Sequence, residues 1–163
     1  MEGMDDIVRE FLVESYENLD QLDRDLVALE SEPGSRPLLS SIFRTIHTIK
    51  GTSGFLAFAR LERLTHVGEN LLVELRDGSR SMDHATTDVL LRLVDTVREL
   101  LAAIEADGTE GAVDVEDAIA DILAVQERAP GAPEAAAPQP EPAAQAEPEG
   151  MPEPEQKPEA EAP

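Results

Sequence analysis

Cysteine is absent from the 163-residue chain. This absence excludes a disulfide scaffold, a thiolate metal site and a cysteine nucleophile, and it fits a reducing compartment. The sequence also lacks the basic and then apolar start of a secretory signal, and it has no apolar run near the roughly 20 residues of a membrane span. We therefore expect a cytoplasmic protein with no membrane insertion.

Basic residues are scarce. The chain carries 13 Lys or Arg against 35 Asp or Glu, which gives a formal net charge of −22. A surface of that sign repels nucleic acid and anionic lipid, so neither is an expected partner. Proline is almost confined to residues 130–163, which hold ten of the twelve prolines in a run of mainly Pro, Ala, Glu and Gln. We expect a folded domain over residues 4–129 and a disordered Pro/Ala/Glu-rich linker over residues 130–163.

Apolar residues recur at helical spacing in five segments, and none shows the alternation of a strand. The expected fold class is all-α, an antiparallel four-helix bundle plus a fifth, C-terminal helix whose apolar stripe includes Leu123. The heptad spacing of the first segment leaves a dimeric coiled coil open as an alternative. The expected boundaries are capping and helix-breaking residues: Asp5 or Asp6 and Pro33 for the first helix, Pro37 in the first turn of the second, Gly78 at the end of the third, Asp83 and Gly108 for the fourth.

The stretch HTIKGTSGF, residues 47–55, interrupts the second segment with two glycines. On a helical wheel His47 lies about 100° from Ile46, the centre of the apolar stripe, so it borders the core without entering it. Gly51 and Gly54 fall on the same face. Glycine inside a helix costs about 1 kcal/mol relative to alanine. The stretch is therefore either a helix stripped of side chains beside His47 or a loop, and a buried core histidine is a further alternative.

The third segment carries Glu69 and His66 on one face, off its leucine stripe. If the chain turns near Phe58, residues equally far from it lie at equal height, which pairs His47 with Glu69 and Lys50 with His66. A carboxylate that accepts one imidazole N–H fixes the tautomer and leaves the other nitrogen as a better nucleophile. Phosphoryl transfer needs such positioning and nearby positive charge, which Lys50 could supply. Periodicity does not decide whether the two faces meet.

The run FRTIHTIKGTSGFLAFARLERLTHVGENLL, residues 43–72, resembles the histidine phosphotransfer (HPt) domain at the N-terminus of chemotaxis kinases of the CheA family. Two motifs carry the resemblance, one from His47 through Phe55 and one from Leu64 through Leu72. The resemblance covers about residues 5–125 and implies a five-helix domain whose second helix continues through the glycines.

By this resemblance His47 is the phosphoacceptor, Glu69 orients it, and Lys50 and His66 stabilise the phosphoryl group. Three further residues are predicted to dock partners: Gly51, Gly54 and Arg44. For Arg44, one turn before the histidine, a solvated arginine without a role is the alternative reading.

The resemblance also implies the partners. One is the catalytic domain of a CheA-type kinase, which would hold ATP and Mg, and the others are CheY-like or CheB-like response regulators, which would hold their own Mg. The domain itself would need no cofactor and would be a monomeric phosphoacceptor and phosphodonor, not an enzyme in isolation. We expect the chain to be a fragment of a histidine kinase of two-component signalling, or else a stand-alone phosphocarrier.

Two alternatives of other classes remain. A metal-binding bundle could use His47, His66, Glu69 and Glu62, although bundle sites usually draw Glu-x-x-His motifs from two helices and only a reversed His-x-x-Glu is present. We therefore expect no metal site. A purely structural interaction bundle, with the acidic tail as a spacer, is the other alternative. A nucleotide-binding P-loop is excluded because Lys50 precedes Gly51 and no upstream glycine matches.

Overall fold

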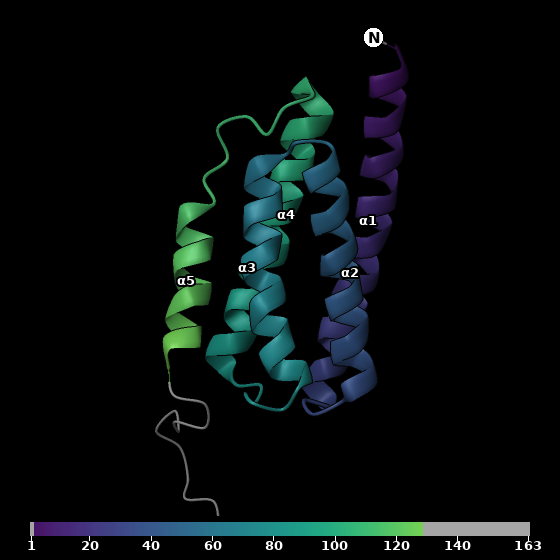
Figure 1. Cartoon of the computed structure of the whole chain (residues 1–163). Helices are drawn as coiled ribbons and strands as arrows, with labels where there is room; N and C mark the ends of the chain where they lie inside the picture. The colour runs from purple at the N-terminus through teal and green to yellow at the C-terminus, as the bar shows by residue number, and fades with distance from the viewer. Residues whose placement is uncertain (1, 129–163) are drawn as a thin grey trace, which may run out of the picture.

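The computed structural model describes residues 2–128, and the linker predicted at residues 130–163 lies outside the described residues. It contains five α-helices: α1 Glu2–Ser31, α2 Arg36–Phe55, α3 Ala59–Arg76, α4 His84–Asp107 and α5 Glu116–Glu127. The first four form an antiparallel bundle, and α5 packs outside against α3 and α4 (Figure 1). Over this range the chain forms no strand, so the predicted all-α fold is confirmed.

The ends of α2 and α4 follow directly from local sequence. Ser35 caps α2 by accepting a hydrogen bond from the backbone N–H of Leu38 at 3.4 Å, and Pro37 lies in the first turn. Asp83 caps α4 in the same way, accepting from the N–H of Thr86 at 2.7 Å. Such caps satisfy amide groups that have no partner inside the helix. At the far end of α4, Gly108 adopts the left-handed conformation with φ 74°.

The predicted end of α3 is confirmed: Arg76 is its last residue, Asp77 is the C-cap, and Gly78 follows in the left-handed conformation with φ 78°. Two other predictions were wrong. The helix α1 begins at Glu2, so Asp5 and Asp6 lie inside it, where acidic residues favour the first turns of a helix. In α5, Leu123 is 45% exposed, because α3 and α4 cover the neighbouring face, where Val125 is buried.

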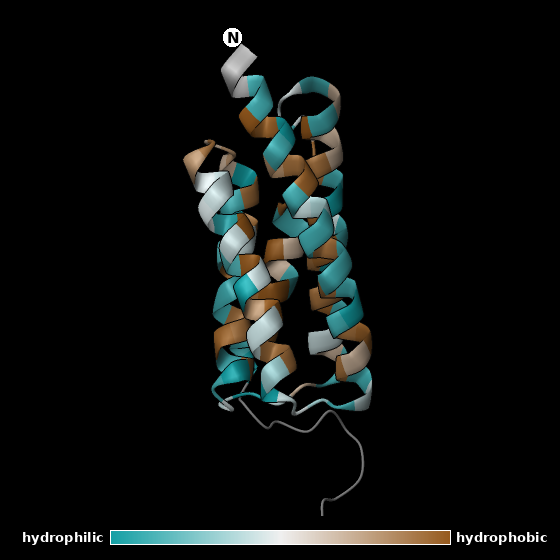
Figure 2. Ribbon diagram, turned by 90° about the vertical axis from the view of Figure 1, so that its right-hand side faces the viewer, coloured by the Kyte–Doolittle hydropathy of each residue, from teal (hydrophilic) through white to brown (hydrophobic). Residues whose placement is uncertain are grey.

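The leucine stripe of α1 lies inside the bundle. Its members are at most 8% exposed: Leu12, Leu19, Leu22, Leu26 and Leu29. That face therefore has no surface left for a second chain, which removes the reason for a dimeric coiled coil. Figure 2 shows the matching pattern on the helices nearest the viewer, along which hydrophobic and hydrophilic residues alternate. Between α3 and α4 the approach is tight, since a Cβ added at Gly68 would lie 2.6 Å from Cδ2 of Leu93.

Candidate functional site

The helices α2 and α3 lie side by side and carry the predicted site. Only Leu56–Phe58 separates them, and Ala57, at φ 63°, is the residue at the turn. Phe58 is buried and its ring stacks on Phe11 of α1, with centroids 5.8 Å apart, which anchors the connection. The helix α2 continues through Gly51 and Gly54 to Phe55, so the loop alternative was wrong.

His47 stands on the surface of α2, with 59% of its side chain exposed. The alternative of a buried core histidine is therefore wrong. Its Nδ1 lies 3.0 Å from Oε2 of Glu69 on α3, so the two off-stripe faces do meet. An ionised carboxylate can only accept, which means that Nδ1 carries the proton of this hydrogen bond. The lone pair is then on Nε2, the nitrogen left without this partner.

Glu69 holds two cationic or potentially cationic groups on one oxygen. Besides His47, the Nζ of Lys50 lies 2.9 Å from the same Oε2. The side chain of Glu69 is only 14% exposed. Burial alone would raise the pKa of Glu69, but the hydrogen bonds from Lys50 and His47 outweigh it and lower the pKa. The carboxylate is thus ionised at neutral pH, and it brings the ammonium of Lys50 close to the imidazole.

This contact corrects the predicted pairing of Lys50 with His66. The flexible lysine side chain extends past the height of His66 to Glu69, one turn further along α3. His66 is exposed, and its side chain makes no hydrogen bond or ion pair with any residue in the range 2–128. The structure therefore places His66 one turn from Glu69 but does not connect it to His47.

The surface beside His47 is as bare as the glycines suggested. A Cβ at Gly51 would meet no atom within 4 Å, and one at Gly54 would approach only the carboxylate of Glu62, at 3.1 Å. Arg44 is exposed one turn before His47, and its carbonyl accepts a hydrogen bond from Thr48 at 2.8 Å.

Sequence reasoning missed two aromatic residues of α2. The ring of Phe43 lies almost parallel to the His47 imidazole, with centroids 5.8 Å apart and planes 15° apart. The guanidinium of Arg76 lies 4.2 Å from the Phe43 centroid. Phe55, at the end of α2, is 81% exposed. The four-residue spacing between Phe43 and His47 was the available signal for the first, since such residues are neighbours on a helix.

Neither a metal centre nor a membrane span is found within residues 2–128. No three His, Asp or Glu side chains gather there in a way that could hold an ion. Glu62, the extra ligand of the metal alternative, faces Gly54. No helix in the same range is both long and apolar enough to cross a bilayer.

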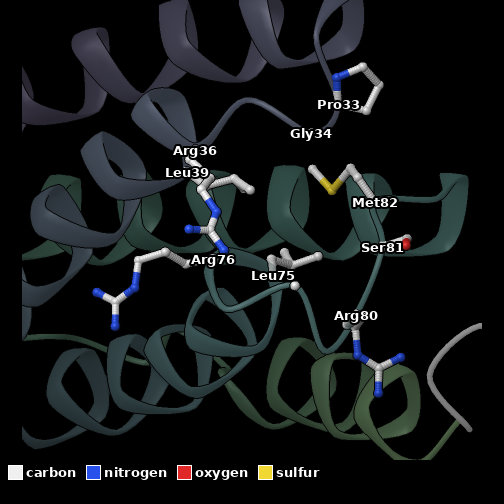
Figure 3. Close-up of a pocket in the computed structure, with 10 residues that line it drawn as sticks. Pro33, Gly34, Arg36, Leu39, Leu75, Arg76, Arg80, Ser81 and Met82 are labelled. Carbon is white, nitrogen blue, oxygen red and sulfur yellow. The ribbon is translucent and has the colours of Figure 1, made fainter.

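A cavity of about 330 Å³ lies at the end of the bundle opposite the α2–α3 turn, between the α1–α2 and α3–α4 connections (Figure 3). Three arginines line it: Arg36, Arg76 and Arg80. Arg80 is turned toward α5, where it donates to the carbonyls of Gln126 and Arg128 at 2.9 and 3.0 Å. This arginine therefore ties the α3–α4 connection to the end of α5.

Fold and site together define a class: a five-helix domain that presents one carboxylate-bound histidine to solvent. The family model of the Hpt domain matches residues 6–107, and the chain belongs to this family, as its sequence predicted. Sensor histidine kinase CheAY of Helicobacter pylori is 41% identical over 110 residues, which are 68% of this chain and 14% of that protein. Chemotaxis protein CheA of Halobacterium salinarum is 35% identical over 105 residues, 64% of this chain and 16% of that protein. The chain thus spans about one-seventh of these relatives.

Solved structures show the same fold. The phosphorylated P1 domain of CheA3 in complex with CheY6 from R. sphaeroides superposes with a TM-score of 0.70 at 27% identity, covering 77% of this chain and 98% of that one. The solution structure of the histidine phosphotransfer domain of CheA gives a TM-score of 0.68 at 27% identity, covering 75% and 92%.

Proposed function

We propose that this chain is the phosphocarrier domain of a CheA-type histidine kinase. In this proposal His47 accepts the γ-phosphoryl group of ATP from the kinase catalytic domain and passes it to an aspartate of a response regulator. One observation carries the proposal. The exposed imidazole of His47 donates its Nδ1–H to the ionised carboxylate of Glu69, which leaves the lone pair of Nε2 free to attack phosphorus. The length of the CheA relatives supports a parent protein with further domains.

The first transfer is a displacement at phosphorus. Nε2 of His47 attacks the γ-phosphorus, and an N–P bond forms while the bond to the β,γ-bridging oxygen breaks. ADP leaves with that electron pair. The ring acquires positive charge, which the carboxylate of Glu69 stabilises through the Nδ1 proton. Lys50, held on the same carboxylate, offers its ammonium to the oxygens of the phosphoryl group.

The second transfer reverses the bonding at nitrogen. A carboxylate oxygen of the regulator's aspartate attacks phosphorus, and the electron pair of the N–P bond returns to Nε2. The imidazole is again neutral, with its proton on Nδ1. The domain therefore ends each cycle unchanged, as a phosphoacceptor and phosphodonor that needs no cofactor of its own. ATP and Mg would belong to the kinase domain, and the regulator would hold its own Mg.

Partner docking would use the bare face of α2. Gly51 leaves room for a partner's backbone, and Arg44 offers an exposed cation in a strongly acidic protein. We add Phe55 to this face as an exposed aromatic anchor. The relative that forms a complex with CheY6 supports a regulator of the CheY or CheB type as one partner. In this proposal the domain acts in the cytoplasm as a monomer.

The test is labelling by a CheA catalytic domain with radioactive ATP. The wild-type protein should gain an acid-labile phosphate, and His47→Gln should gain none while keeping its helical circular dichroism. The other two histidines provide controls. His84→Gln, at the exposed start of α4, should label normally, and His66→Gln should label more slowly but still label. Full labelling of His47→Gln would show that the assignment is wrong.

A further inference from the structure

Phe43 provides the second contact that holds the His47 ring. The hydrogen bond to Glu69 fixes one point of the imidazole, at Nδ1, with an N···O distance of 3.0 Å. A single hydrogen bond still permits rotation of the ring about the bond axis, which would swing Nε2 and its lone pair. The near-parallel Phe43 ring, inclined by 15° and with its centroid 5.8 Å from that of the imidazole, limits that rotation because it packs in an offset stack beside the ring.

Phe43 is itself held from two directions. It packs against the hydrophobic core of the bundle, so its base is rigid. Its ring also contacts the guanidinium of Arg76, at 4.2 Å from the centroid, which is the geometry of a cation–π contact. Figure 3 shows this guanidinium pointing away from the cavity that Arg76 helps to line. The contacts thus form a series from α3 through Phe43 to the imidazole on α2.

We propose that Phe43, held in place by Arg76, is a positioning residue for phosphoryl transfer at His47. Glu69 selects the nitrogen that reacts, and Phe43 sets the plane in which its lone pair points. The inference rests on the proposed function, because it concerns the orientation of the same nucleophile. Orientation matters here because attack on phosphorus requires the incoming nitrogen in line with the leaving oxygen.

The experiment uses phosphoramidate, a small phosphoryl donor that needs no docking surface. The rate of phosphorylation at His47 is followed by phosphorus NMR for the wild type, Phe43→Leu, Phe43→Tyr and Arg76→Met. Phe43→Leu keeps an apolar side chain but removes the ring, and we expect it to react roughly three- to tenfold more slowly, the range that an aromatic pair is worth. Phe43→Tyr restores the ring and should return the rate to within about twofold of wild type.

Arg76→Met tests the same proposal without touching the core contact of Phe43, and it remains informative if Phe43→Leu unfolds. We expect it to slow the reaction by about two- to fivefold, in line with the loss of one exposed cation–π contact. Nitrogen NMR of His47 should show the proton still on Nδ1 in every variant, because Glu69 is unchanged. A slower reaction with an unchanged tautomer is a result that a loss of stability alone would not produce.

The outcomes separate the two proposals. If Phe43→Leu reacts at the wild-type rate, or if Phe43→Tyr is as slow as Phe43→Leu, the positioning role is overturned and the phosphocarrier function stands. If the wild-type protein takes up phosphate at His47 from neither phosphoramidate nor a kinase, the function itself is overturned. The expected pattern, slow with leucine and restored with tyrosine, supports the inference.

Discussion

Replacing Gly51 with alanine should make the domain more stable and, at the same time, a poorer partner in phosphotransfer. Gly51 lies in the interior of α2, where alanine is favoured over glycine by about 1 kcal/mol. The new methyl group would meet no atom within 4 Å, so no steric cost opposes this gain. For a folded part of this size, about 1 kcal/mol corresponds to a rise of roughly 3–5 °C in the midpoint of thermal unfolding.

The same methyl group would stand on the bare face next to His47. If a partner packs closely there, one added methyl should cost about 1 kcal/mol or more of contact energy, which is about fivefold in rate. The assay measures phosphate transfer from the phosphorylated domain to a CheY-type regulator, with phosphoramidate uptake as the control that should not change. A more stable variant that transfers at the wild-type rate would remove Gly51 from the docking surface. A less stable variant would refute the helix-propensity argument.

Three further predictions use other parts of the domain. Gly68→Ala should lower the midpoint of thermal unfolding, because the new methyl group would lie 2.6 Å from Leu93. This overpacking should cost about 1–3 kcal/mol against a gain of about 1 kcal/mol in helix propensity, so a raised midpoint would refute the reasoning. Because the folded pKa of Glu69 is lowered, the stability that its charge contributes is complete above the ordinary carboxyl pKa of about 4.3 and is lost as the pH falls through the lower folded value. The difference in unfolding free energy between wild type and Glu69→Gln should therefore be larger near neutrality than in acid, and a pH-independent difference would contradict the ion-pair account. Phe55→Ser should slow transfer to a regulator without changing stability by more than about 0.5 kcal/mol, whereas Val27→Ser on α1, 66% exposed, should do neither; equal effects of the two would argue against a docking anchor.

Local chemistry explains which elements were predictable. Pro37 in the first turn of α2, the cap Asp83 and the left-handed Gly108 act within a few residues of chain, so local sequence is enough to place the start of α2 and both ends of α4. The start of α1 and the environment of Leu123 in α5 were mispredicted. Leu123 is exposed because α3 and α4 cover the neighbouring face of α5, which its own short segment does not reveal.

The candidate site divides in the same way. That His47 lies on the rim of α2 follows from periodicity within one helix, and its pairing with Glu69 followed from a short turn between antiparallel helices. The contact partner of the Lys50 side chain could not be predicted in this way, because a flexible four-carbon side chain can reach residues at more than one height on the facing helix. Its ammonium forms an ion pair with the carboxylate of Glu69.

By itself, the sequence determined the helical content, the order of the five helices and the family, because periodicity, caps and contiguous motifs are properties of neighbouring residues. Only the tertiary structure decided that one oxygen of Glu69 serves both His47 and Lys50, and that Arg76 of α3 lies over Phe43 of α2. These contacts join different helices. Their geometry depends on the rotation and spacing of packed helices, which no single segment encodes.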